Sequence, residues 1–104
     1  MDNIIIYNTD DGKSNVKLYA SDGTVWLSQK AMSELFNCSV DNISLHLKHI
    51  FSDKELDRDS VTEESSITAS DGKHYKVTLF SLDAILAVGF RVRSPRGVQF
   101  RRWA

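Results

Sequence analysis

The chain has 104 residues, a formal net charge of −1 and one cysteine, Cys38. This length allows one domain with one modest core. A lone cysteine excludes an intrachain disulfide, and the apolar run near the acidic N-terminus is too short for a signal peptide. No apolar run approaches the roughly 20 residues of a membrane-spanning helix. We therefore expect a cytoplasmic protein with no membrane partner.

Asp-Gly pairs that begin at Asp11, Asp22 and Asp71 predict the turns of β-hairpins, because Asp and Gly both tolerate a positive φ. We expect strands over residues 4–7, 16–20 and 24–27, and a second hairpin over residues 61–68 and 74–80. Four basic residues lie at or just after these turns: Lys13, Lys73, His74 and Lys76. Such hairpin residues either contact phosphate or are ordinary surface residues.

Residues 27–50 predict two short helices joined by the corner Asn37-Cys38-Ser39. Ser28 is a good N-cap for the first helix and Ser39 for the second, and Asn37 can take the left-handed conformation that ends a helix. Apolar residues at helical spacing predict the buried sides: Ala31, Met32, Leu35 and Phe36, then Val40, Ile43, Leu47 and Ile50. Two amphipathic helices with so tight a corner predict a helix-turn-helix, whose second helix enters the DNA major groove.

The remaining segments predict a charged connector and two more helices. The connector covers residues 52–59. Ser81 is the expected N-cap of a helix over residues 82–88, and Gly89 is its expected end. Ser94 and Pro95 predict the start of a last helix, with an inner face formed by Gly97, Phe100 and Trp103. This helix lacks a stop signal, so we expect residues 1–104 to be one N-terminal domain of a longer protein.

The side of the second helix opposite its apolar stripe is polar. Asn42, Ser44, His46 and Lys48 lie on this side or at its flanks, and such side chains form hydrogen bonds with base edges or phosphates. We expect Asn42 to pair with adenine and Lys48 to contact a phosphate. Gln29, at the start of the first helix, is expected to reach a backbone phosphate. The alternative is a solvated face with no ligand.

Basic residues are unevenly distributed along the chain. Residues 1–88 hold eight of the 13 basic residues and all 14 acids, whereas residues 89–104 hold no acid and five arginines: Arg91, Arg93, Arg96, Arg101 and Arg102. Arginine forms forked hydrogen bonds with phosphate and keeps its charge, so we expect a phosphate-binding patch. The alternative is that these arginines pair with acids elsewhere, such as Asp57, Asp59, Glu63 and Glu64.

Enzyme signatures are absent from the sequence, which has no Gly-rich phosphate loop, GxSxG or HExxH motif. Cys38, His46 and His49 lack a fourth metal ligand. No orienting acid or oxyanion hole accompanies a Cys–His pair. We therefore expect a protein that is not an enzyme and has no cofactor, no bound metal and no small-molecule substrate.

Four blocks of the sequence together resemble the RhuM family, bacterial proteins labelled virulence proteins and described as DNA-binding. The blocks are VWLSQKAMSELF, DNISLHLKHIF, ITASDGKHYKVTLFSLDAI and VGFRVRSPRGVQFRRWA. The last block also resembles the Bro-N and KilA-N domains of phage antirepressors. The resemblance implies a cytoplasmic, DNA-associated module, often carried on mobile elements, within a longer protein.

These patterns predict an α+β domain, winged-helix-like, in which small antiparallel hairpins pack on a helix-turn-helix and a C-terminal helix. We expect it to bind double-stranded DNA and to regulate transcription. The alternative is a protein-interaction or homodimerisation module of a larger phage- or virulence-associated protein. Leu45 bears on this choice, because at the centre of a polar helix side it either contacts a thymine methyl group or packs against a hairpin or second subunit.

Overall fold

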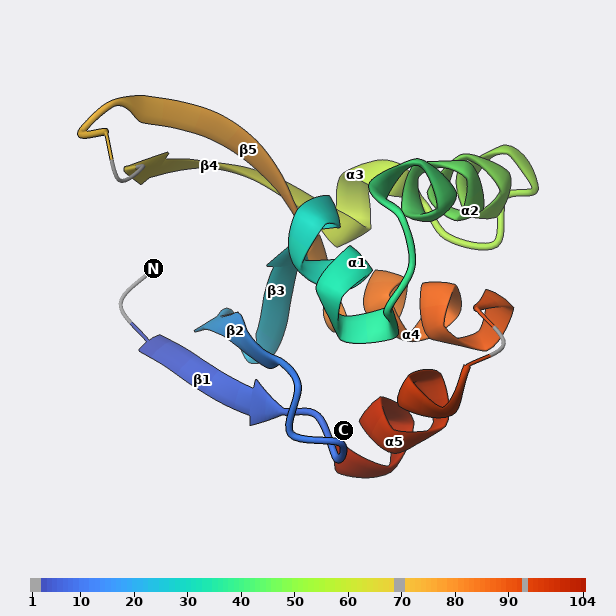
Figure 1. Cartoon of the computed structure of the whole chain (residues 1–104). Coiled ribbons are helices and arrows are strands. Elements are labelled where there is room, and N and C mark those ends of the chain that lie inside the picture. Colours follow the sequence, from blue (N-terminus) through green and yellow to red (C-terminus); the bar gives the residue numbers. More distant parts are fainter. Residues whose placement is uncertain (1–2, 69–70, 93) are drawn as a thin grey trace.

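The computed structural model describes residues 3–68, 71–92 and 94–104 (Figure 1). Within these ranges five strands form one antiparallel sheet in the order β1-β2-β3-β5-β4. The strands are β1 (Asn3–Asn8), β2 (Asn15–Ser21), β3 (Thr24–Ser28), β4 (Thr62–Thr68) and β5 (His74–Ser81). The helices are α1 (Gln29–Phe36), α2 (Val40–Ser52), α3 (Arg58–Val61), α4 (Leu82–Arg91) and α5 (Pro95–Trp103). The predicted α+β class is confirmed.

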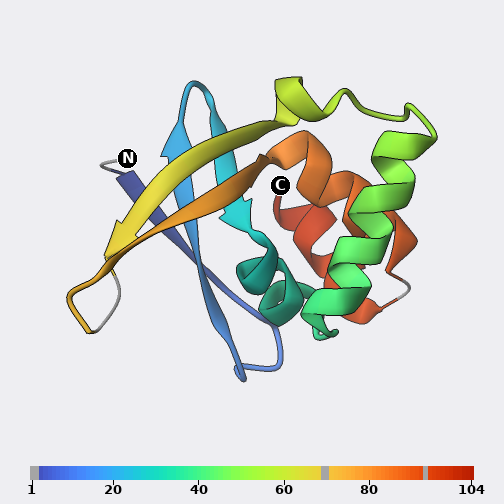
Figure 2. The same cartoon turned by 90° about the horizontal axis from the view of Figure 1, so that it is seen from above.

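The predicted hairpins are parts of one sheet, because β3 joins them. β3 pairs with β2 on one side and with β5 on the other. The contact with β5 is short and consists of the pairs Trp26–Ser81, Leu27–Phe80 and Ser28–Leu79. Before Leu79, β5 pairs with β4 alone, so the β4–β5 hairpin projects away from the helices (Figures 1 and 2).

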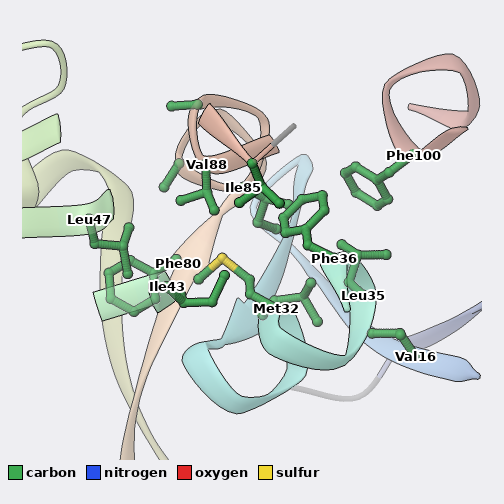
Figure 3. Close-up of a cluster of buried hydrophobic side chains, with 14 of the residues drawn as sticks. Val16, Met32, Leu35, Phe36, Ile43, Leu47, Phe80, Ile85, Val88 and Phe100 are labelled. Carbon is green, nitrogen blue, oxygen red and sulfur yellow. The ribbon is translucent and has the colours of Figure 1, made fainter. Parts of the chain in front are cut away.

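The core lies between one face of the sheet and the helices. Alternate strand residues point into it, among them Val16 of β2, Leu27 of β3 and Phe80 of β5, as the period of two in a strand requires. Figure 3 shows the α1 side chains at the centre of this cluster, with Phe80 on one side and Phe100 of α5 on the other. Among the described helices, none combines the length and apolarity needed to cross a membrane.

Gly89 does not end α4, which corrects the prediction. The helix continues to Arg91, and the glycine instead permits a close contact. A Cβ at Gly89 would lie 3.2 Å from the ring of Phe36, and one at Gly97 would lie 2.9 Å from the carbonyl oxygen of Gly89. The two glycines therefore let α4 approach both α1 and α5.

Three further expectations differ from the structure. Ser81 precedes α4, but its hydroxyl forms no capping hydrogen bond and is buried without a partner among the described residues. Val40, the first residue of α2, is 41% exposed, although its spacing places it on the same side as Ile43 and Leu47. Trp103 is 45% exposed, although its ring contacts that of Tyr7. The short helix α3 begins at the end of the predicted connector and extends to Val61, where the strand was expected to begin.

Candidate nucleic-acid interface

Local hydrogen bonds define the corner between α1 and α2. The Ser28 hydroxyl accepts a hydrogen bond from the Ala31 N–H at 3.1 Å, and the Ser39 hydroxyl accepts one from the Asn42 N–H at 3.0 Å. Asn37 lies between them in the left-handed region, with φ 56° and ψ 53°, and ends α1. The two N-caps and the left-handed Asn37 are confirmed. They place α2 directly after a tight corner.

α2 presents one buried side and one exposed side. Its buried residues are Ile43, Leu47 and Ile50, as the apolar spacing predicted. The exposed residues include Asn42, Leu45 and Lys48, and Leu45 is 50% exposed. The exposed side of α2 is therefore accessible to a ligand.

Ser44 and Gln29 contact each other where α2 meets the start of α1. The Ser44 hydroxyl donates a hydrogen bond to Oε1 of Gln29 at 3.1 Å, across 15 residues of sequence. Both side chains are half-buried. The bond occupies the Gln29 oxygen, and its NH₂ group has no hydrogen-bond partner among the described residues. That amide group can therefore donate to an external acceptor.

His46 lies on the opposite flank of α2. Its imidazole is half-buried, and burial lowers its pKa; the nearby charges of Arg91 and His49 lower this pKa further. A neutral imidazole has one donor and one acceptor nitrogen. At neutral pH His46 therefore offers hydrogen bonds rather than a positive charge.

Two of the arginines in residues 89–104 form ion pairs with acids. Arg91 forms ion pairs with Glu55 at 2.9 Å and Asp53 at 3.7 Å. Arg96 pairs with Asp11 at 3.0 Å, and its side chain is only 11% exposed. The alternative of pairing with acids thus holds for these two arginines, although the acids differ from those that the sequence suggested.

Two other arginines are more available to a ligand. The guanidinium of Arg101 lies over the ring of Phe90, 4.2 Å from its centroid. Stacking of this kind leaves the guanidinium edge free for hydrogen bonds. Arg102 is exposed. Arg93 lies outside the described residues.

The sequence reasoning missed two basic residues that the fold brings beside Lys76. Lys30 of α1 and Arg58 of α3 line a groove together with Lys76 of β5. They come from three separate elements, so neither helical nor strand periodicity indicates that they meet. In the sequence, nothing distinguishes Lys30 and Arg58 from other surface cations.

A known family is similar to part of the chain. Residues 60–104, a little under half of the chain, match the model of the Virulence protein RhuM family. This segment covers β4, β5, α4 and α5, so the similarity to that family lies in the C-terminal part of the chain. No curated protein and no solved structure matches the chain.

Proposed function

We propose that this chain, whose C-terminal segment is similar to the RhuM family, is a DNA-binding domain of the winged helix-turn-helix kind. In this proposal α2 lies in the major groove, and the domain regulates transcription in a setting linked to mobile elements. The observation that carries the proposal is the capped corner before α2, followed by an exposed polar helix side.

The order of the elements supports a winged arrangement. β3, α1, α2 and the β4–β5 hairpin follow one another in the chain, and β3, β5 and β4 are neighbours in the sheet. The hairpin contacts α1 at its base and projects away from the helices (Figures 1 and 2). Such a hairpin can contact the sugar-phosphate backbone next to the groove that the second helix enters.

Within the proposal, base contacts come from α2. Asn42, Ser44 and His46 supply hydrogen-bonding groups, whereas Lys48 contacts a phosphate. The free amide group of Gln29 reaches a backbone phosphate.

Arg93, Arg101 and Arg102 are the proposed phosphate contacts of the C-terminal segment. Arg91 and Arg96 reach phosphate only by exchanging their present acidic partners. We therefore expect these two arginines to contribute less to DNA affinity than to the fold.

The test is a salt titration of binding to labelled random-sequence duplex, followed by fluorescence anisotropy. If about five phosphates are neutralised, log affinity should fall against log salt with a slope of roughly −4 to −5. Lys48→Gln should reduce the magnitude of this slope by roughly one. The control variant Lys17→Gln changes an exposed residue of β2 and should leave the slope unchanged. Binding that does not depend on salt, or no binding at low salt, would contradict the proposal.

The second candidate is a protein-interaction module, favoured by the exposure of Leu45. A leucine at the centre of an exposed helix side is suited to contact with a second subunit. Sedimentation of the wild type and of Leu45→Asn distinguishes the candidates. Loss of a dimer with intact duplex binding would support interaction at this site, and unchanged association would contradict it.

A further inference from the structure

A groove of about 700 Å³ separates the β4–β5 hairpin from the beginnings of α1 and α2. Three cations line it: Lys30 of α1, Arg58 of α3 and Lys76 of β5. All three are exposed, and no Asp or Glu lies among the described residues that line the groove. A hollow with several cations and no acid concentrates positive potential and attracts an anion.

The three cations are not engaged with acids. Among the described residues, no ion pair involves Lys30, Arg58 or Lys76. Arg58 lies 6.0 Å from the centroid of the Phe51 ring, a contact that leaves its charge in place. Glu64 lines a separate, adjoining hollow with Lys76 and forms no ion pair with it. The positive charge of the groove is therefore available to a ligand.

Backbone groups add to this charge. Tyr75, Lys76, Val77 and Thr78 of β5 all line the groove, and this stretch pairs with β4 but not with β3. The other edge of this stretch therefore carries unpaired backbone N–H and C=O groups. Val40, also in the lining, is the first residue of α2, so the positive end of that helix dipole lies at the same place.

We infer that this groove holds the phosphodiester backbone of one DNA strand, gripped between the hairpin and the helical corner. The inference rests on the proposed function and extends it, because it names where the strand runs. Gln29 lies in the groove lining and bonds to Ser44 of α2. Lys48 follows Ser44 by one helical turn, so the groove and the exposed side of α2 form a continuous surface.

Two matched triple variants test the inference in the full chain. One replaces Lys30, Arg58 and Lys76 with glutamine. The control replaces Lys13, Lys17 and Lys54 with glutamine and changes the net charge equally. The groove variant should flatten the salt slope of duplex binding by roughly 2–3, since each lost phosphate contact removes about 0.9. The control should change it by less than about one. Thermal unfolding of both variants verifies that they fold.

A second measurement uses the wild type and does not depend on the folding of variants. Lysine acetylation, quantified by mass spectrometry with and without duplex, should show protection of Lys30 and Lys76 but not of Lys13 or Lys17. If the wild type binds duplex but the two triple variants behave alike and Lys30 stays reactive, the groove inference is overturned while the proposed function stands. If the wild type binds no duplex, both are overturned.

Discussion

The guanidinium of Arg96 lies 3.0 Å from the carboxylate of Asp11, which precedes it by 85 residues. The same guanidinium donates a hydrogen bond to the carbonyl oxygen of Glu34 at 2.7 Å. One side chain of α5 thus connects the β1–β2 turn with α1. Asp11 also accepts hydrogen bonds from the Thr9 hydroxyl and the Lys13 N–H, at 2.7 Å and 3.0 Å.

These contacts predict a pH-dependent stability. The Lys13 N–H, followed by Thr9 and Arg96, holds the pKa of Asp11 well below its usual value of 3.8. A lowered pKa in the folded state stabilises the protein above the unfolded value, and this contribution is lost as the pH falls toward the folded value. Urea unfolding should therefore find Asp11→Asn less stable than wild type at pH 7 and closer to it at pH 3. Asp10→Asn is the control, and equal behaviour of the two variants would contradict the assignment.

The close approach of α4 and α5 predicts which of two glycine-to-alanine substitutions lowers the stability of the protein more. Alanine normally favours a helix over glycine by about 1 kcal/mol. At Gly97 the added Cβ would lie 2.9 Å from a backbone oxygen, which cannot move aside easily, whereas at Gly89 it meets a side-chain ring at 3.2 Å. Gly97→Ala should lower the free energy of unfolding by about 1–3 kcal/mol, and Gly89→Ala by less. Equal or reversed effects in urea denaturation would argue against this packing.

The two serine hydroxyls before α2 and α4 predict opposite results. Ser39→Ala removes a formed N-cap bond and should cost about 1 kcal/mol. Ser81→Ala removes a buried hydroxyl that has no partner among the described residues, and should be neutral or stabilising. Parallel denaturant titrations of the two variants check this difference. A large loss from Ser81→Ala would mean that its hydroxyl is hydrogen-bonded.

The environment of His46 predicts a second pH dependence of stability, at higher pH than that of Asp11. Burial, with Arg91 and His49 nearby, lowers its pKa below 6.5 in the folded state. The unfolded state then binds the proton first, so stability is full above pH 6.5 and declines as the pH falls below that value. His46→Gln should lose less stability than wild type between pH 7 and pH 5 in thermal unfolding. An identical decline in both proteins would show that His46 does not cause it.

The elements were predictable where the chemistry is local. Ser28, Asn37 and Ser39 determine the helical corner through bonds to residues within a few positions, so their sequence spacing was sufficient. Gly89 was misinterpreted as a helix end for the opposite reason. Its role depends on Phe36 and Gly97, which belong to other helices, and a local stop signal cannot report such contacts.

The candidate site was less predictable, because its charges are arranged by tertiary contacts. Arg91 and Arg96 lie in a segment that has five arginines and no acid, yet their acidic partners lie 36 and 85 residues away. Conversely, Lys30 and Arg58 are isolated cations in the sequence and meet only after the hairpin folds back. Net charge per segment therefore overestimated the C-terminal patch and did not indicate the groove.

The short contact between β3 and β5 has a consequence for local opening of the fold. Three residue pairs join β5 to β3, whereas seven join it to β4. Opening the outer part of the β4–β5 hairpin, which does not pair with β3, therefore exposes few core side chains. Such local opening costs less free energy than global unfolding. Amide hydrogens near Lys76 should exchange well before those of Leu79 and Phe80. The hairpin can change its angle to meet a partner while the helical core stays closed.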